Sequence, residues 1–92
     1  MSLNYDKLAY IVSSDNRIAV METLRDSPST PSTIAKATDR DIAHISRAIQ
    51  ELREKGHVEL KVSESVRKGR IYGLTEQGAM LAGDLSEVNT GR

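Results

Sequence analysis

Residues 38–78 decide the fold, and they read TDRDIAHISRAIQELREKG (38–56) followed by HVELKVSESVRKGRIYGLTEQG (57–78). In the first part, apolar residues recur every three or four positions, as they do along one side of a helix: Ile42, Ile45, Ile49 and Leu52. These four positions fall within about 80° of arc on a helical projection. His44 and Arg47 lie opposite them, so the sequence predicts an amphipathic helix over residues 41–55.

The second part has the pattern of a β-hairpin. Apolar and polar residues alternate over residues 58–62 and again over 72–74, and a basic, glycine-containing segment at 63–70 separates the two runs. A helix with a polar outer face followed by a basic hairpin is the arrangement with which winged helix-turn-helix domains bind duplex DNA. We therefore expect an α+β winged helix-turn-helix fold with three to five helices and a two- to three-stranded antiparallel wing.

The residues before this stretch predict three further helices, over about 3–12, 16–25 and 32–37. Residues 13–15 offer side chains that can cap the second helix. Thr30 is placed to cap the third, with Pro31 at its first position, where the missing N–H has no consequence. Asp39 is suited to a left-handed turn and Asp41 to the cap of helix 41–55.

The residues after the strands predict a last helix. Gly56 is expected to end helix 41–55, and Thr75 to cap the last one, whose apolar positions are Leu81, Leu85 and Val88. A chain of 92 residues makes one domain, here 1–92 with a core over about 8–86 and a flexible tail at 87–92. With three Tyr and neither Phe nor Trp, the core must be aliphatic and small, and dimerisation would add buried area.

The charge is unevenly distributed. The formal net charge is zero, but residues 32–72 contain nine Lys or Arg against six Asp or Glu, a local charge of +3. DNA binding requires a local positive field and not a positive total, so the distribution permits it.

The exposed side of helix 41–55 contains the candidates for base contacts. Its first two turns would enter the major groove, which places Ala43, His44 and Arg47 toward bases and Gln50 at the edge. Arg47 can bond guanine in bidentate fashion, Gln50 adenine, and Ala43 a thymine methyl group. The alternative for Arg47 is a surface ion pair with Glu51, worth only about 0.3–0.5 kcal/mol.

Three hydroxyl side chains are candidates for phosphate contacts. Ser46 lies at the flank of the apolar stripe, where it could reach a phosphate or bond back to the Ile42 carbonyl. Ser32 and Thr33 lie at a helix N-terminus, whose free N–H groups favour phosphate, although simple capping explains them equally well.

The hairpin turn adds three cations around a glycine: Arg67, Lys68 and Arg70. Such side chains suit a narrow minor groove and its phosphates. Taken alone, the segment would be read as a solvated loop, and its position after a helix-turn-helix favours DNA contact.

Other functions find little support in the sequence. There is no Cys, so neither a disulfide nor a thiolate metal site is expected. His44 and His57 are the only histidines, and His57 is expected to pack where helix meets strand. No nucleophile–base pair or phosphate-binding loop is present, so we expect no enzyme activity and no cofactor or metal. No apolar run is long enough to span a bilayer, and a cytoplasmic protein is expected.

Four segments resemble small archaeal winged-helix transcriptional regulators close to the MarR and ArsR groups: SSDNR (13–17), TPSTIAKA (30–37), HISRAIQELREKG (44–56) and RKGRIYGLTEQG (67–78). The resemblance implies a homodimer on pseudo-palindromic double-stranded DNA. It carries DNA contacts onto the following residues: Ser32, Thr33, His44, Ser46, Arg47, Arg67, Lys68 and Arg70. The metal-sensing cysteines of the ArsR group and the long terminal helices of MarR proteins are absent, so no metal response or small-molecule effector is expected.

The partner surfaces leave alternatives open. The apolar residues proposed for a dimer contact are Leu8, Tyr10, Ile11 and Leu85. A winged-helix module that binds another protein through the same face is the main alternative function, favoured by the zero net charge and by Asp39 and Asp41. A non-specific architectural binder of chromatin DNA is the second.

Overall fold

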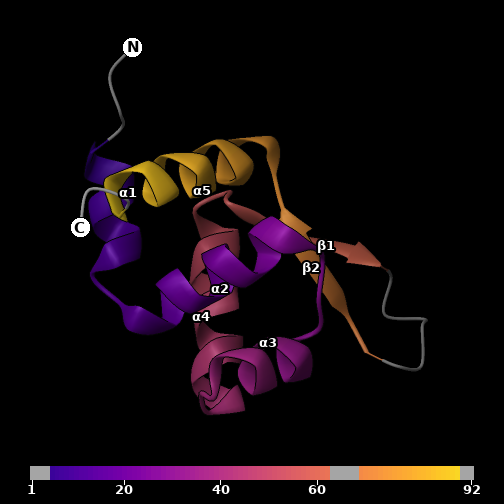
Figure 1. Cartoon of the computed structure of the whole chain (residues 1–92). Coiled ribbons are helices and arrows are strands. Elements are labelled where there is room, and N and C mark those ends of the chain that lie inside the picture. Colours follow the sequence, from indigo (N-terminus) through magenta and orange to yellow (C-terminus); the bar gives the residue numbers. More distant parts are fainter. Residues whose placement is uncertain (1–4, 63–68, 90–92) are drawn as a thin grey trace.

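The computed structural model describes residues 5–62 and 69–89. Five helices and one hairpin follow one another in the order α1 Tyr5–Val12, α2 Asp15–Asp26, α3 Pro31–Thr38, α4 Ile42–Glu54, β1 Val58–Val62, β2 Ile71–Leu74 and α5 Glu76–Asn89. Figure 1 shows α1 and α5 together at one end, α3 at the other, and the hairpin projecting sideways. The predicted winged-helix architecture is confirmed. The tail expected from residue 87 is wrong in part, because α5 continues to Asn89.

The predicted capping residues are found at the start of both helices of the helix-turn-helix. Thr30 Oγ1 accepts the N–H of Thr33 at 3.2 Å, and Pro31 is the first residue of α3. Asp41 Oδ1 accepts the N–H of Ala43 at 2.8 Å at the start of α4. These bonds satisfy N–H groups that a helix cannot pair internally, so each helix begins at a residue that the sequence specifies.

Two residues with positive φ make the turns around α4. Asp39 has φ 56° and ends α3 in the left-handed conformation, and Gly56 has φ 82° after α4. Both were predicted, since Asp and Gly are among the residues that adopt this region most readily. The turn at Asp39 redirects the chain from α3 into α4.

The hairpin is antiparallel and is tied to the helices by one extra bridge. Leu60 lies opposite Tyr72, and the register is irregular between Leu60 and Val62. Ser29 exchanges two backbone hydrogen bonds with Tyr72, at 3.0 and 2.9 Å, just before α3. The wing is therefore anchored to the segment that leads into the helix-turn-helix.

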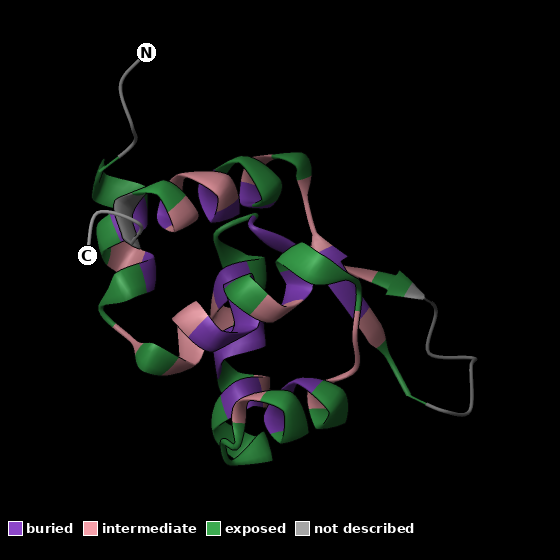
Figure 2. Cartoon of the chain, in the orientation of Figure 1, coloured by how far each residue is buried: buried purple, intermediate pink, exposed green. Residues whose placement is uncertain are grey.

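The core is aliphatic, as predicted, and α2 runs through its middle. The helix α2 contacts α1, α3, α4, α5 and β2. Figure 2 shows the buried residues on the inward faces of these elements. The largest fully buried side chains come from five helices: Ile11, Met21, Ile34, Ile45, Ile49, Leu52 and Leu85.

The apolar stripe of α4 differs from the prediction at one position. Ile42, expected in the core, is 49% exposed, whereas Ala48 is 2% exposed. The buried positions are Ile45, Ala48, Ile49 and Leu52, which form one stripe against α2 and α3. Ile42 is the first residue of α4, where the helix emerges from the core, so no neighbouring helix covers it.

The proposed dimer contacts are wrong for three of the four residues. Leu8, Ile11 and Leu85 are all at most 4% exposed, because α1 and α5 pack on each other and on α2 within one chain. Tyr10 is half-buried and lies under two cations, with the Arg17 guanidinium 4.0 Å from its ring centre.

A buried histidine joins the end of α4 to the start of α5. His57 is 2% exposed, as predicted where helix meets strand, and its Nδ1 lies 2.9 Å from Gln77 Nε2. Its carbonyl oxygen accepts the N–H of Thr75 at 3.0 Å. Burial lowers the pKa of His57, and the positive charges of Lys7 and Lys55 lower it further.

The packing of α5 against the backbone of His57 requires a glycine at position 78. A Cβ at Gly78 would overlap the backbone carbonyl of His57, whereas a Cβ at Gly83 in the same helix would meet open space. We expect Gly78→Ala to destabilise the fold by about 1–3 kcal/mol, since backbone must move. Gly83→Ala, the matched control, should stabilise it by up to about 1 kcal/mol. Urea unfolding of both variants checks this, and equal effects would contradict the packing.

The pKa of His57 predicts a pH dependence of stability. The unfolded chain binds a proton near the ordinary value of 6.5, whereas the folded chain binds it only at lower pH. The stability contributed by neutral His57 is therefore complete above this value and is lost as the pH falls below it. The free energy of unfolding should decrease from about pH 7.5 to about pH 5, and less so in His57→Gln. His44→Gln, at the exposed histidine, is the control, and an unchanged slope in His57→Gln would refute the assignment.

Candidate nucleic-acid interface

The helix α4 presents a polar face opposite its buried stripe. Ala43, His44, Arg47 and Gln50 are all exposed, as predicted, and the Arg47 side chain is 80% exposed. These residues lie in the first two and a half turns of α4, directly after the cap at Asp41. The structure therefore brings the four base-contact candidates onto one exposed face.

Glu51 is held mainly by another arginine and not by Arg47. Its Oε1 lies 3.1 Å from Arg17 Nε, whereas its Oε2 lies 3.8 Å from Arg47 Nε. The ion pair predicted as the alternative for Arg47 is present, but it is long and its arginine is exposed. Such pairs contribute little, so Arg47 can leave Glu51 at small cost.

Arg17 is a structural residue that the sequence did not reveal. Its guanidinium donates to Tyr10 O at 2.7 Å and to Ser13 Oγ at 2.9 Å, and stacks on the Tyr10 ring. It thus links the turn between α1 and α2 to the polar side of α4. Glu51 is 34 residues away in sequence, so no local pattern signals this pair.

A cleft of about 510 Å³ lies between α3, α4 and the hairpin. Four of the predicted contact residues line it: Ser32, Ser46, Gln50 and Arg70. The remaining lining includes apolar surface from Ile42 and Tyr72. The cleft therefore joins the three elements that were expected to contact DNA.

The hydroxyl candidates differ in their surroundings. Thr33 takes part in the cap, because its hydroxyl accepts from Thr30 Oγ1 at 3.0 Å, which agrees with the capping interpretation. Ser32 is exposed, and Ser46 is half-buried at the cleft. Within the described part of the chain Ser46 does not bond to the Ile42 carbonyl, so the back-bonding alternative is not realised.

The wing is described only at its base. Gly69 has φ 109°, which agrees with its predicted place in a turn, and Arg70 is exposed beside the cleft. Arg67 and Lys68 fall outside the described residues, as does the rest of 63–68. Their predicted contacts stay predictions.

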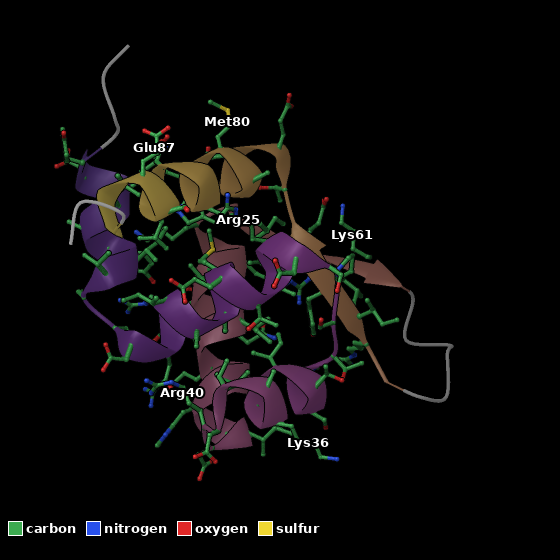
Figure 3. The ribbon with its side chains drawn as sticks, in the orientation of Figure 1. Arg25, Lys36, Arg40, Lys61, Met80 and Glu87 are labelled. Atoms are coloured by element: carbon green, nitrogen blue, oxygen red, sulfur yellow. The ribbon has the colours of Figure 1, made fainter. Side chains whose placement is uncertain are left out.

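Cations and two carboxylates share this end of the molecule. Figure 3 shows Lys36 and Arg40 projecting where α3 and α4 lie, while Met80 and Glu87 project from α5 on the opposite side. Arg40 Nη1 donates to Asn16 Oδ1 at 3.2 Å. Asp41 is engaged in its cap, and Asp39 is exposed in the turn.

Other kinds of site are not visible in residues 5–62 and 69–89. Within these ranges no three His, Asp or Glu side chains gather in a way that could hold a metal ion. No helix described there is long and apolar enough to cross a membrane.

Sequence comparison identifies the family. The family described as the HVO_A0261 N-terminal domain matches residues 5–91. The chain belongs to this family. No curated protein matches the sequence.

Several solved structures share the fold of this chain. It is similar to a double mutant of Lactococcus lactis ZitR, with TM-score 0.76 and 18% identity over 85% of this chain and 53% of that one. It is similar to NMB1585, a MarR family regulator from Neisseria meningitidis, with TM-score 0.75 and 26% identity over 85% and 56%. Streptococcus pneumoniae FabT, solved in complex with DNA, has TM-score 0.72 and 20% identity over 85% and 55%.

These similarities confirm the winged-helix fold and the MarR part of the predicted resemblance. The chain spans about half the length of these proteins. Similarity to the ArsR group and an archaeal origin stay predictions.

Proposed function

We propose that this domain is a sequence-specific double-stranded DNA-binding transcription regulator. The helix α4 enters the major groove, α3 crosses the backbone, and the wing contacts the adjacent minor groove and phosphates. A homodimer bound to an inverted repeat acts as a repressor by occupying the site. The activity is binding and not catalysis.

The observation that carries this proposal is the exposed N-terminal half of α4. Ala43, His44, Arg47 and Gln50 project from a helix whose other face is fixed in the core. A recognition helix uses its N-terminal residues to contact base edges, and these four residues supply donors, an acceptor and a small apolar group. FabT, which has a similar fold and was solved in complex with DNA, supports a DNA-binding role.

The flanking elements supply contacts to the DNA backbone. Ser32 and Thr33 are exposed at the start of α3, where the partial positive charge of the helix N-terminus favours a phosphate. Ser46 and Arg70 border the cleft between α4 and the hairpin. Arg67 and Lys68 extend the positive charge of the wing in sequence. Contacts of this kind fix position and orientation, while α4 specifies sequence.

Selection from random duplexes tests the proposal. The chain is mixed with labelled random-sequence duplexes at low and moderate salt, and the bound sequences are recovered and read. Enrichment of an inverted repeat with half-sites about one helical turn apart is expected for a dimeric regulator. Binding without enrichment would indicate an architectural role, and no binding at low salt would indicate a protein-interaction module.

Arg47→Ala tests base reading. We expect it to weaken binding to the selected duplex by about 1–3 kcal/mol and to relax preference at one base pair, because a bidentate contact is lost. Arg53→Ala, on the same helix but beyond its exposed N-terminal half, is the control and should keep the preference. Affinities for selected and random duplexes decide, and an equal loss on both would refute base reading by Arg47.

Lys68→Ala tests phosphate contact by the wing. It should weaken all duplexes alike and reduce the slope of log affinity against log salt by about 0.9, since one fewer counterion is released. Arg25→Ala removes an exposed cation from α2 and should leave the slope unchanged. An altered base preference in Lys68→Ala would contradict a phosphate role.

A further inference from the structure

Ile42 is a large apolar side chain left exposed beside the polar face of α4. The other large apolar side chains exposed in the described residues are Tyr5, Val12 and Met80, which belong to α1 and α5. Ile42 alone among them belongs to the helix-turn-helix. It is 49% exposed and follows directly on the cap residue Asp41.

Ile42 belongs to a second stripe of α4, which faces the cleft. Ser46 and Gln50 follow it at intervals of four residues, and all three line the cleft toward α3 and the hairpin. Ala43 and Arg47 lie one residue further around the helix. Ile42 therefore lies beside the base-contact candidates and at the N-terminal end of α4, which enters the major groove most deeply in the proposed function.

The surroundings of Ile42 favour DNA over an apolar protein surface. The hydroxyls of Ser32 and Ser46 and the guanidinium of Arg70 border the same cleft. The carboxylate of the adjacent Asp41 is directed to the N–H of Ala43. An apolar partner would remove water from these polar groups and offer no hydrogen bonds in return, whereas DNA offers phosphate acceptors around an apolar contact.

We propose that Ile42 recognises the C5-methyl group of a thymine in each half-site, which is an inference that rests on the proposed function. Ile42 has no donor or acceptor, so it can distinguish bases only by apolar contact. Thymine is the base that presents a methyl group in the major groove. The contact of Ile42 thereby adds recognition of the thymine methyl group to any hydrogen bonds that Ser46 and Gln50 make in the same row.

A uracil scan of the selected duplex tests this assignment. Each thymine is replaced in turn by deoxyuridine, which removes the methyl group and keeps the base-pairing edge. For the unaltered chain we expect one position per half-site at which affinity falls about fourfold, as for the burial of one methyl group. Ile42→Ala should bind the thymine duplex about fourfold more weakly and lose little further affinity at that position. Met80→Ala removes an exposed apolar side chain from α5 and should retain the full fourfold effect.

The outcomes separate the inference from the proposed function. The inference is supported if Ile42→Ala no longer loses affinity when the sensitive thymine is replaced by deoxyuridine, while Met80→Ala still does. A uracil effect of the same size in Ile42→Ala would assign the methyl contact elsewhere, for instance to Ala43, and overturn it. The absence of any sensitive thymine would overturn it while DNA binding still stands. If no duplex is bound at all, the proposed function fails, and the inference with it. Urea unfolding verifies that Ile42→Ala is folded, as its half-exposed position predicts.

Discussion

Burial of one face of α4 against α2 and α3 fixes the orientation of the α4 residues that are proposed to contact DNA. Ile45, Ile49 and Leu52 are fully buried, and Ala48 lies between them. A helix that buries one stripe can present only the opposite side to a partner. Ala48 is 2% exposed, so its small side chain also packs against the neighbouring elements. This close packing sets the rotation of α4 about its axis, and therefore which side chains face outward.

The Arg17–Glu51 pair supports that orientation from the polar side. Arg17 is hydrogen-bonded to the turn between α1 and α2, so it links Glu51 to that turn. The same pair neutralises a carboxylate that would otherwise compete for Arg47. The Arg17–Glu51 pair is short and part-buried, whereas the Arg47–Glu51 pair is long and its arginine is exposed, so the two arginines have different roles. Arg17 links the turn between α1 and α2 to α4, whereas the Arg47 side chain stays exposed.

Local signals allowed most of the fold to be predicted, and the misses have a common cause. Thr30, Asp41 and Gly56 act through their immediate neighbours, so sequence alone identifies the helix boundaries. Periodicity locates an apolar stripe but not its edge. For this reason Ile42 was predicted to be buried and is exposed, whereas Ala48 is buried without having been predicted to be. Nor does it reveal whether a stripe is covered by the same chain, so Leu8 was mistaken for a dimer contact. Arg17 gave no signal because its partner is distant in sequence. The exposed face of α4 was predictable because it depends on one helix.

The zero net charge is compatible with a surface that attracts DNA. Of Asp39 and Asp41, the two acidic residues just before α4, the Asp41 carboxylate accepts the N–H of Ala43 and is partly neutralised by the N-terminus of the helix. Glu76 and Glu87 belong to α5, on the side of the molecule opposite α3 (Figure 1). Exposed charges separated by more than a Debye length of about 8 Å are largely screened at physiological ionic strength. The acidic residues of α5 therefore lower the total charge without cancelling the field of Arg40, Arg47 and Arg70, which is the field that the proposed DNA contact depends on.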